Sequence, residues 1–466
     1  MPTSPRLGRA ASPFAAEKRR ARDCAPYPTA TTSRRGSVLV IVLWIAFGLV
    51  TVALYFADAM SSELRASSNR VAGLAADQAI DGAARYVSSI LCAFATNGVV
   101  PDLTQYKASA VPVGDAHFWI IGRDPSGVAS TEPCFALIDE GSKLNVNHAN
   151  TNELAALPNI TADFVQAILD WHSSTGATLA AVNYAPLNYA SKHAAFETVD
   201  ELRLVYGATI ALLAGEDVNR NGVLDANETD ANHNGVVDPG LFEYLTAFSR
   251  EPNLHSDGTA FTNVNNRAQL ATLLRTTFGA ARANQILARL SRRTNAGRAA
   301  TPIVFSNLLQ FYLQSGMTSA EFAQIANAIT ASSATYISGR VNINTANAVV
   351  LACLPGMDPG TAQLLIRYRQ QNPGNLTSIA WIVDALGSGS SVVQALAQGD
   401  YITMSSYQFT ADIAALGPYG RGYRRTKFIF DLSAGTVQVV YRQDLSRLGW
   451  ALGSKVRTAS LAKDTR

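Results

Sequence analysis

The chain has few charged residues and lacks a recognisable set of catalytic residues. Only 16% of its 466 residues are charged, while 48% are hydrophobic. The six histidines are scattered and form no His-Glu-x-x-His motif, and no Gly-rich phosphate loop follows an expected strand. The Gly-rich stretch GSGSS at 387–391 is not the Gly-x-Ser-x-Gly turn of a hydrolase. The sequence therefore predicts a protein that is not an enzyme but has enough apolar residues for packed cores.

Cysteine is also scarce. The four cysteines, Cys24, Cys92, Cys134 and Cys353, include no Cys-x-x-Cys pair, which argues against a zinc site. Cys92 and Cys134 are either a disulfide pair, if this part of the chain is exported, or two separate small apolar residues.

Positive charge is concentrated at the N-terminus. Residues 1–36 contain eight Lys or Arg and two Asp or Glu, a net charge of +6, so the remaining residues carry −3 of the total of +3. A mildly acidic body argues against strong binding of phosphate groups by that part of the chain.

An uncharged apolar stretch follows the basic segment. Residues 37–57 read SVLVIVLWIAFGLVTVALYFA, and no charged residue lies between Arg35 and Asp58. About 20 apolar residues span a bilayer as a helix, so we predict a transmembrane helix here. Because basic residues precede it and only Asp58 and Glu63 follow it closely, the N-terminus is expected in the cytoplasm and the body on the other side.

The helical pattern continues beyond the membrane. Residues 58–94 are rich in Ala, lack Pro and keep apolar residues near helical spacing. A helix that is apolar in its first half and amphipathic in its second resembles the N-terminal helix of type IV pilins and pseudopilins. In those families a prepilin peptidase cuts after a Gly. The resemblance implies cleavage between Gly36 and Ser37, with residues 1–36 as a cytoplasmic leader.

The fifth residue after this cleavage position departs from the usual pilin pattern. Most family members carry Glu there, and its carboxylate pairs with the N-terminal amine of a neighbouring subunit, whereas this chain has Ile41. A carboxylate in lipid is costly without such a partner, and a subunit at the tip of a fibre has no neighbour above it. The K-type minor pseudopilin of type II secretion is the member that typically lacks the Glu.

Two segments in the middle of the chain repeat one pattern. Residues 143–172 and 340–369 both read Asn-hydrophobic-Asn, then an Ala-Asn pair, a Leu-rich turn, Leu-Pro and a second apolar run. Asn and Thr before such runs are good N-caps, and Leu-Pro ends the first helix. Each copy is predicted to be a helical hairpin with a further helix such as 196–207, within repeats at 143–207 and 340–386.

These hairpins resemble helix-hairpin-helix modules, which occur in membrane-anchored DNA receptors of competence and in type II secretion protein K. DNA-binding hairpins use a Gly-hydrophobic-Gly turn, because phosphate approaches bare backbone. Here the second turn is Gly356-Met357-Asp358 and the first, from Asn159 to Thr161, has no Gly. The turns favour contacts with protein, and no nucleic-acid partner is expected. We interpret Arg367 and Arg369 as a solvated basic face.

Residues 217–238 match the twelve-residue calcium loop of EF-hands. Calcium binds six to eight hard oxygens; alternating Asp and Asn supply short oxygen side chains, and Gly222 permits the sharp turn. The alternative is a loop that is merely rich in Asx turns. The predicted ligands are Asp217, Asn219, Asn221, the carbonyl of Val223, Asp225 and Glu228.

A second copy of the loop begins thirteen residues after the first. Its twelfth position is Leu241, which has no oxygen, so Glu243 is considered as a substitute. No flanking helices that open on binding are indicated, so calcium is expected to hold a polar loop in one shape. Calcium is also a feature of the K-type family. The predicted ligands of the second loop are Asp230, Asn232, Asn234, the carbonyl of Val236 and Asp238.

Residues 115–139 and 400–448 read as strands interrupted by turns. The simplest assembly is an α+β fold: a pilin-like domain, in which a long helix packs on an antiparallel sheet drawn from both segments, with a large helical domain inserted. The predicted parts are the leader at 1–36, the transmembrane helix at 37–57, the pilin-like helix and first strands at 58–140, the helical insertion at 141–395 with an exit linker at 387–391, the last strands at 396–452 and a tail at 453–466.

Taken in order, these motifs resemble the type II secretion K family over residues 34–450. The resemblance implies a calcium-binding minor pseudopilin, anchored once in the bacterial inner membrane with its body in the periplasm. It would stand at the tip of the pseudopilus beside the I- and J-type pseudopilins. Two other functions stay open: a competence-type DNA receptor, and a calcium-stabilised anchored scaffold whose N-terminus is not cleaved.

Overall fold

The computed structural model describes residues 37–94, 98–124, 130–173, 184–255, 257–292 and 301–464. The chain forms two compact units, which divide between Ala66 and Ser67. The predicted leader lies outside the described residues, and Gly36 lies there with it, so cleavage after Gly36 stays a prediction.

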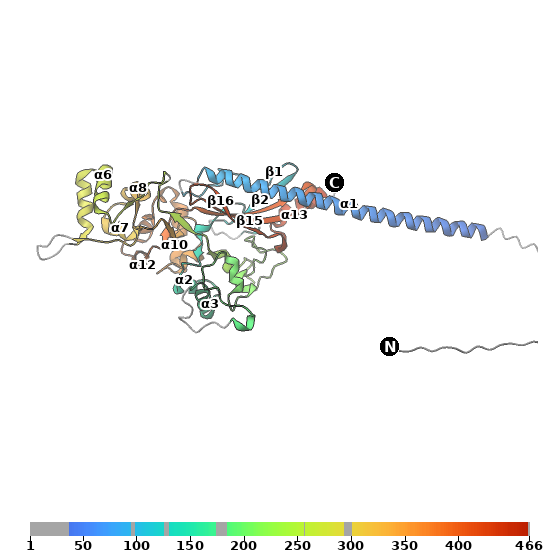
Figure 1. Ribbon diagram of the computed structural model, residues 1–466, viewed down its shortest axis with the longest axis horizontal. Coiled ribbons are helices and arrows are strands. Elements are labelled where there is room, and N and C mark those ends of the chain that lie inside the picture. The colour runs from blue at the N-terminus through green and yellow to red at the C-terminus, as the bar shows by residue number, and fades with distance from the viewer. Residues whose placement is uncertain are drawn as a thin grey trace, which may run out of the picture. The chain divides into compact units, whose positions relative to one another are not determined.

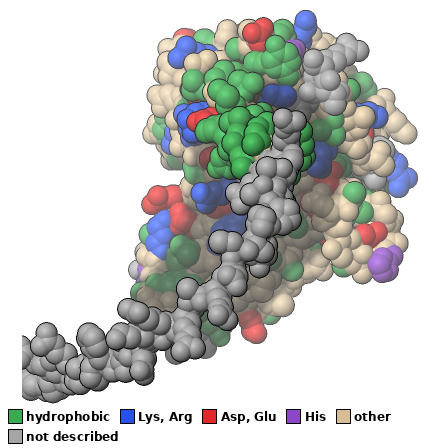
Figure 2. Space-filling model, turned by 90° about the vertical axis from the view of Figure 1, so that its right-hand side faces the viewer, with side chains coloured by type: hydrophobic (Ala, Val, Ile, Leu, Met, Phe, Trp, Pro, Cys, Tyr) green, Lys and Arg blue, Asp and Glu red, His purple; other side chains and the backbone are tan. Residues whose placement is uncertain are grey.

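The first helix, α1, runs from Ser37 to Cys92. Its first part carries the predicted transmembrane stretch, where the large apolar side chains from Val38 onwards are exposed. In Figure 2, apolar side chains gather on this exposed first part of α1. The hydroxyl of Thr51 donates to the carbonyl of Phe47, so this polar group is satisfied within the helix. Among the described helices, α1 is the one long and apolar enough to cross a membrane.

The second part of α1 packs on a β-sheet (Figure 1). Half of the helix residues in the contact are alanines, which let the helix approach the sheet closely, and each of the larger side chains adds about 1.5–3 kcal/mol. The buried residues of α1 in this core are Ala76, Ala79, Ile80, Ala83, Val87 and Leu91, and the sheet contributes Phe118, Phe409, Phe428 and Phe430.

The sheet is antiparallel, with strand order β1-β2-β14-β15-β16 and β3 also paired with β14. All nine residues of β14 are buried, and Ile413 lies opposite both Ile120 and Thr426. Strands that precede the helical region therefore join strands that follow it. The strands are β1 (Val111–Val113), β2 (Ala116–Ile121), β3 (Ile138–Asp139), β14 (Gln408–Leu416), β15 (Arg424–Asp431) and β16 (Gln438–Asp444).

The chain between β3 and β14 is mainly helical, and its apolar residues form one extended core. Its α-helices are α2 (Thr151–Ala155), α3 (Ala162–His172), α4 (Ile210–Leu213), α5 (Leu241–Tyr244), α6 (Arg267–Arg289), α7 (Leu308–Ser315), α8 (Ser319–Ile325), α9 (Ala348–Ala352), α10 (Pro359–Gln371), α11 (Trp381–Leu386) and α12 (Ser391–Leu396). A two-stranded ladder of β6 (Arg250–Pro252) and β11 (Tyr336–Ser338) lies among them.

Three copies of one module make up this helical region. Each copy opens with Asn-hydrophobic-Asn, and the side-chain oxygen of the first Asn accepts the backbone N–H two residues on, at 3.0, 2.8 and 3.0 Å for Asn145, Asn263 and Asn342. A short strand at the start of each module pairs in parallel with one at its end. The pairs are β4 (Leu144–Asn145) with β5 (Leu245–Thr246), β7 (Thr262–Asn263) with β10 (Ile329–Thr330), and β12 (Val341–Asn342) with β13 (Ile402–Thr403).

The second Asn of each module binds a segment that lies further along the same module. Asn147, Asn265 and Asn344 donate through their side-chain amides to the carbonyls of Phe196, Phe305 and Leu376, at 3.0, 3.0 and 3.4 Å. The two repeats predicted from the sequence are the first and third modules. The second, at 262–330, went unrecognised.

The two predicted hairpins are present as a short helix, a turn and a longer helix: α2 with α3, and α9 with α10. The further helix expected within 196–207 is present as a 3-10 helix (Val199–Leu204). Two other details differ from the prediction. Residues 387–391 join α11 to α12 within the helical region and are not an exit linker. The expected tail contains α13 (Gly453–Asp464).

A buried ionic group lies where the sheet meets the helical region. The Glu140 carboxylate accepts hydrogen bonds from the ammonium group of Lys143, at 3.0 Å, and from the hydroxyl of Thr410 in β14, at 2.6 Å. It also accepts the hydroxyl of Thr246 from the first module. Glu140 thereby ties the two parts together.

Cys92, Cys134 and Cys353 are free thiols. The disulfide between Cys92 and Cys134 that the sequence left open is therefore absent. Cys24 lies outside the described residues.

Candidate metal centre

The first Asp- and Asn-rich loop closes around its own carboxylates. Asp217 accepts the backbone N–H of Asn221 and of Gly222, each at 2.8 Å. The side chains of Asn219 and Asn221 converge on one oxygen of Asp225, at 2.6 and 2.8 Å. The loop is thus folded so that the predicted ligands at its first, third, fifth and ninth positions face one another.

Glu228, at the twelfth position, closes the other side of this loop. Its two carboxylate oxygens accept the backbone N–H groups of Asn219 and Asp225, both at 3.1 Å. The backbone is left-handed at Arg220 (φ 59°) and Gly222 (φ 84°). A Cβ at Gly222 would also lie 3.1 Å from the side chain of Arg123, so both conformation and space favour glycine there.

The second loop reproduces the first bond for bond. Asp230 accepts from Asn234 and Gly235 at 3.2 and 2.8 Å, and the amides of Asn232 and Asn234 donate to Asp238 at 2.5 and 3.2 Å. The left-handed residues recur as His233 (φ 58°) and Gly235 (φ 73°). The loops differ in exposure: the first is buried against the sheet, and the second is exposed to solvent.

Glu216 supplies the second loop with the carboxylate that its own twelfth position lacks. Its two oxygens accept the backbone N–H of Ala231 at 2.6 Å and of Asp238 at 3.1 Å, much as Glu228 does in the first loop. Leu241 is fully buried in the core. Glu243, the substitute considered from the sequence, instead pairs with Arg123 at 2.8 Å. The only sequence signal for Glu216 is its place directly before Asp217.

The two loops lie between α4 and α5 of the first module. α4 ends just before them and α5 begins just after them, and the N–H of Gly240 donates to the carbonyl of Ala214 at 2.9 Å. The N–H of Glu216 donates to the carbonyl of Asp238, also at 2.9 Å. Because the chain leaves and re-enters the module at adjacent points, the insertion leaves the module's framework intact.

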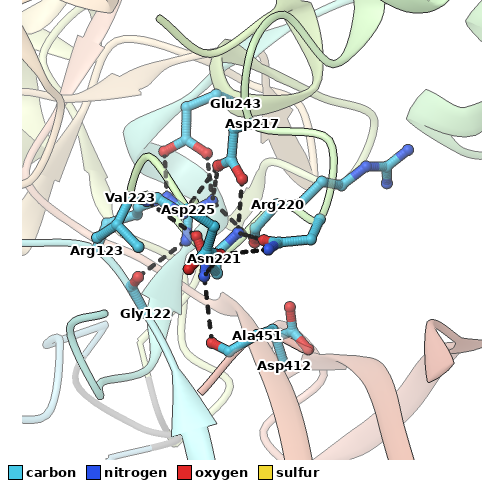
Figure 3. A network of polar contacts seen from close by, with 12 residues as sticks. Gly122, Arg123, Asp217, Arg220, Asn221, Val223, Asp225, Glu243, Asp412 and Ala451 are labelled. Atoms are coloured by element: carbon cyan, nitrogen blue, oxygen red, sulfur yellow. Dashed lines mark hydrogen bonds and ion pairs between the residues drawn. The ribbon is translucent and has the colours of Figure 1, made fainter. Parts of the chain in front are cut away.

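Figure 3 shows the first loop beside Arg123 and Glu243. The sheet holds this loop through a buried arginine. Arg425 of β15 is fully buried and donates to the carbonyls of Asn219 and Arg220. Its guanidinium also binds both oxygens of Asp412 in β14, with Nε at 2.8 Å from Oδ1. Arg123 adds a weaker tie, since its Nη2 lies 3.7 Å from Asp217.

Burial shapes the charge of these carboxylates. It raises the pKa of Asp217, although the guanidinium of Arg123 opposes this, and it also raises the pKa of Glu228. The pKa of Asp230 is lowered, and the largest cause is the hydrogen bond from the backbone N–H of Gly235. Among the described residues, no three His, Cys, Asp or Glu side chains are arranged to hold a metal ion by themselves. A cation would therefore depend on the Asn side chains and main-chain carbonyls as well.

The hairpin turns offer little to a phosphate group. Asp358 caps α10 and accepts the N–H groups of Gly360 and Thr361 at 2.8 and 3.0 Å, so a carboxylate occupies the donors that phosphate would use. Arg369 is buried and donates to the carbonyls of Ile343 and Ala346. The interpretation of Arg369 as part of a solvated face was therefore wrong.

Searches of protein-family models and of curated proteins found no match. Among solved structures, the chain is similar to a chain in the crystal structure of the GspK-GspI-GspJ complex from the type 2 secretion system of enterotoxigenic Escherichia coli. The two chains share 9% identity, the alignment covers 79% of this chain and 95% of that chain, and the TM-score is 0.37.

Proposed function

We propose that the chain is a minor pseudopilin of a bacterial type II secretion system. The observation that carries this proposal is α1, an exposed apolar helix whose continuation packs on an antiparallel sheet. The first part would anchor the protein in the inner membrane, with its N-terminus in the cytoplasm and its body in the periplasm. A prepilin peptidase would remove residues 1–36.

The place of this subunit would be the tip of the pseudopilus. Ile41 stands where a subunit inside the fibre needs a Glu to pair with its neighbour, and a tip subunit has no such neighbour. The three modules add a large helical body to the sheet. Such a body fits the end of a fibre better than its shaft, where subunits stack closely.

The partners proposed are the I- and J-type minor pseudopilins. Copurification of the full chain with both from detergent-solubilised membranes tests this. A complex that contains all three is the expected result. A chain that purifies alone, although I and J still form a complex with each other, would contradict the tip role.

We also propose that both loops bind calcium as a structural clip. The first site would use Asp217, Asn219, Asn221, Asp225, Glu228 and the carbonyl of Val223. The second would use Asp230, Asn232, Asn234, Asp238 and the carbonyl of Val236, with Glu216 completing it. The matching hydrogen bonds of the two loops support two sites of one kind. Because Arg425 and Asp412 hold the first loop, bound calcium would stiffen the contact between sheet and helical region.

A further inference from the structure

A cavity of about 500 Å³ lies between the second and third modules and the segment that leads into β14. Its volume is typical of sites that hold small ligands. Most of the walls are uncharged, with apolar side chains from several elements. These include Phe261, Leu309, Phe322, Ile379, Met404 and Tyr407.

Three charged side chains line this cavity: Glu251 from β6, Arg340 and Asp400. Arg340 forms ion pairs with both acids, and its Nη1 lies 3.8 Å from Oε2 of Glu251. The same oxygen of Glu251 accepts the hydroxyl of Thr403 at 2.9 Å. The side chains of Arg340 and Glu251 are only 9% and 14% exposed. Among the residues that the structure describes, two carboxylates therefore share one guanidinium, which leaves one negative charge without a partner.

The other oxygen of Glu251, Oε1, and Nε of Arg340 have no hydrogen-bond partner in the described part of the chain. Both residues also line a second cavity of about 10 Å³, which has room for one water molecule. A water there can satisfy both atoms. The uncompensated charge then remains as the feature that the large cavity presents to a ligand.

Electrostatics supports this account of the charge. Burial raises the pKa of Glu251 to about 7, against the opposing effects of Arg340 and Thr403. The carboxylates of Asp400 and Asp139 raise it further. Because burial is the main cause, the carboxyl group is close to taking up a proton at neutral pH, and a cation placed against it would favour its charged form.

We propose that this cavity binds an aliphatic cation, an ammonium or guanidinium group on a short carbon chain. The cationic head would lie against Glu251 and Asp400, and the stem would pack on Phe322 and Ile379. The same chemistry is offered by a free alkylamine and by a Lys or Arg side chain of another protein. This function is independent of the secretion role proposed above.

Calorimetry on the full chain in detergent tests the proposal, with agmatine as the cation and (4-hydroxybutyl)urea, which carries no charge, as its neutral analogue of similar size. We expect agmatine to bind roughly tenfold or more tightly than the analogue, since a desolvated charge pair distinguishes them. Glu251→Gln should remove most of this preference. Glu197→Gln, at an exposed ion pair, should leave it unchanged. Equal affinity for both probes, or binding of neither, overturns the proposal.

A second variant guards against a folding defect in Glu251→Gln. Ile379→Trp places a bulky ring where the carbon stem would pack, without touching the charges. It should weaken binding of agmatine while the thermal unfolding temperature stays close to that of the parent chain. Unchanged affinity in a folded Ile379→Trp chain would contradict the site. A short peptide with one Arg, measured beside the same peptide carrying the uncharged citrulline, distinguishes a protein side chain from a free alkylamine as the natural ligand. Preference for the Arg peptide over agmatine indicates a protein partner, and the reverse indicates a free amine.

Discussion

At the scale of single residues, Arg425 is the side chain on which the first loop most depends. It is fully buried, pairs with Asp412 and donates to two carbonyls of the loop. We predict that Arg425→Met destabilises the protein by about 3–5 kcal/mol, because it leaves the Asp412 carboxylate buried without a counter-charge. Chemical denaturation at neutral pH measures this.

The matched control for Arg425 is Arg442, which pairs with Asp81 at 3.3 Å but is 60% exposed. Solvent screens such pairs, so Arg442→Met should cost less than about 1 kcal/mol. Equal effects of the two substitutions would show that Arg425 does not hold the loop in the way described.

Glu140 gives a prediction about pH. Burial alone would raise its pKa, but the ammonium groups of Lys143 and Lys427 and the hydroxyls of Thr246 and Thr410 outweigh burial and lower it to about 2. A carboxyl group whose pKa is lowered by folding contributes stability above its ordinary pKa, and this contribution is lost as the pH falls towards 2.

Glu140→Gln should therefore be less stable than the parent chain by about 3 kcal/mol at pH 7. The difference should shrink between pH 4.5 and pH 2, the range between the ordinary and the lowered pKa. Denaturation curves at pH 7, 5, 4 and 3 test this, with the exposed Glu197→Gln as control. A difference that stays constant with pH would mean that the carboxylate charge is not what stabilises the junction.

At the scale of elements, the pair of calcium loops gives the next prediction. The parent chain should bind two calcium ions, Glu228→Gln should lose the first and Glu216→Gln the second, because each removes the carboxylate that closes one loop. If the sites bind at ~10⁻⁴–10⁻³ M, 10 mM calcium should stabilise the folded chain by about 1.5–3 kcal/mol per site. Calorimetric stoichiometry and thermal unfolding with and without chelator measure both effects.

Two outcomes would contradict this account of the loops. Two ions still bound by Glu216→Gln would mean that Glu216 is not a ligand. No calcium bound by the parent chain at 10 mM would mean that the loops are Asx-rich turns, whose internal hydrogen bonds suffice to shape them.

Some elements could be predicted from the sequence because their signals are local. The apolar run of α1, the two hairpins and the folded Asp- and Asn-rich loop that begins at Asp217 each follow from residues close together in the chain. The second module was missed because Asn263 and Asn265 are followed by α6, which has no Leu-Pro break. Two features show that it has the same structure as the other modules: the parallel pairing of β7 with β10, and the hydrogen bond from the Asn265 side chain to the carbonyl of Phe305. Both features link residues that are far apart in the sequence.

The site residues show the same limit. Glu216 was missed and Glu243 considered because the spacing of a loop motif cannot tell which nearby carboxylate points inward. Arg369 was placed on a solvated face because an arginine at a helical position is usually exposed. Its guanidinium instead satisfies two carbonyls beside the third Asn-hydrophobic-Asn turn, a role visible only once that turn is folded.

At the scale of the whole molecule, the chain combines a long apolar helix, a sheet built from strands on either side of a long insertion, and a helical body of three modules. The strands of the sheet come from both ends of the insertion, so the sheet can form only after the modules have been synthesised. The insertion is thus part of the folding unit, which agrees with the single compact unit that begins at Ser67.

The central claim is that the chain is a pseudopilin, and its mature N-terminus tests this most directly. Mass spectrometry of the protein from native membranes, with and without the prepilin peptidase, should show a chain that begins at Ser37 only when the peptidase is present. A chain that keeps residues 1–36 in the presence of the peptidase would contradict the claim and leave an uncleaved anchored protein in its place.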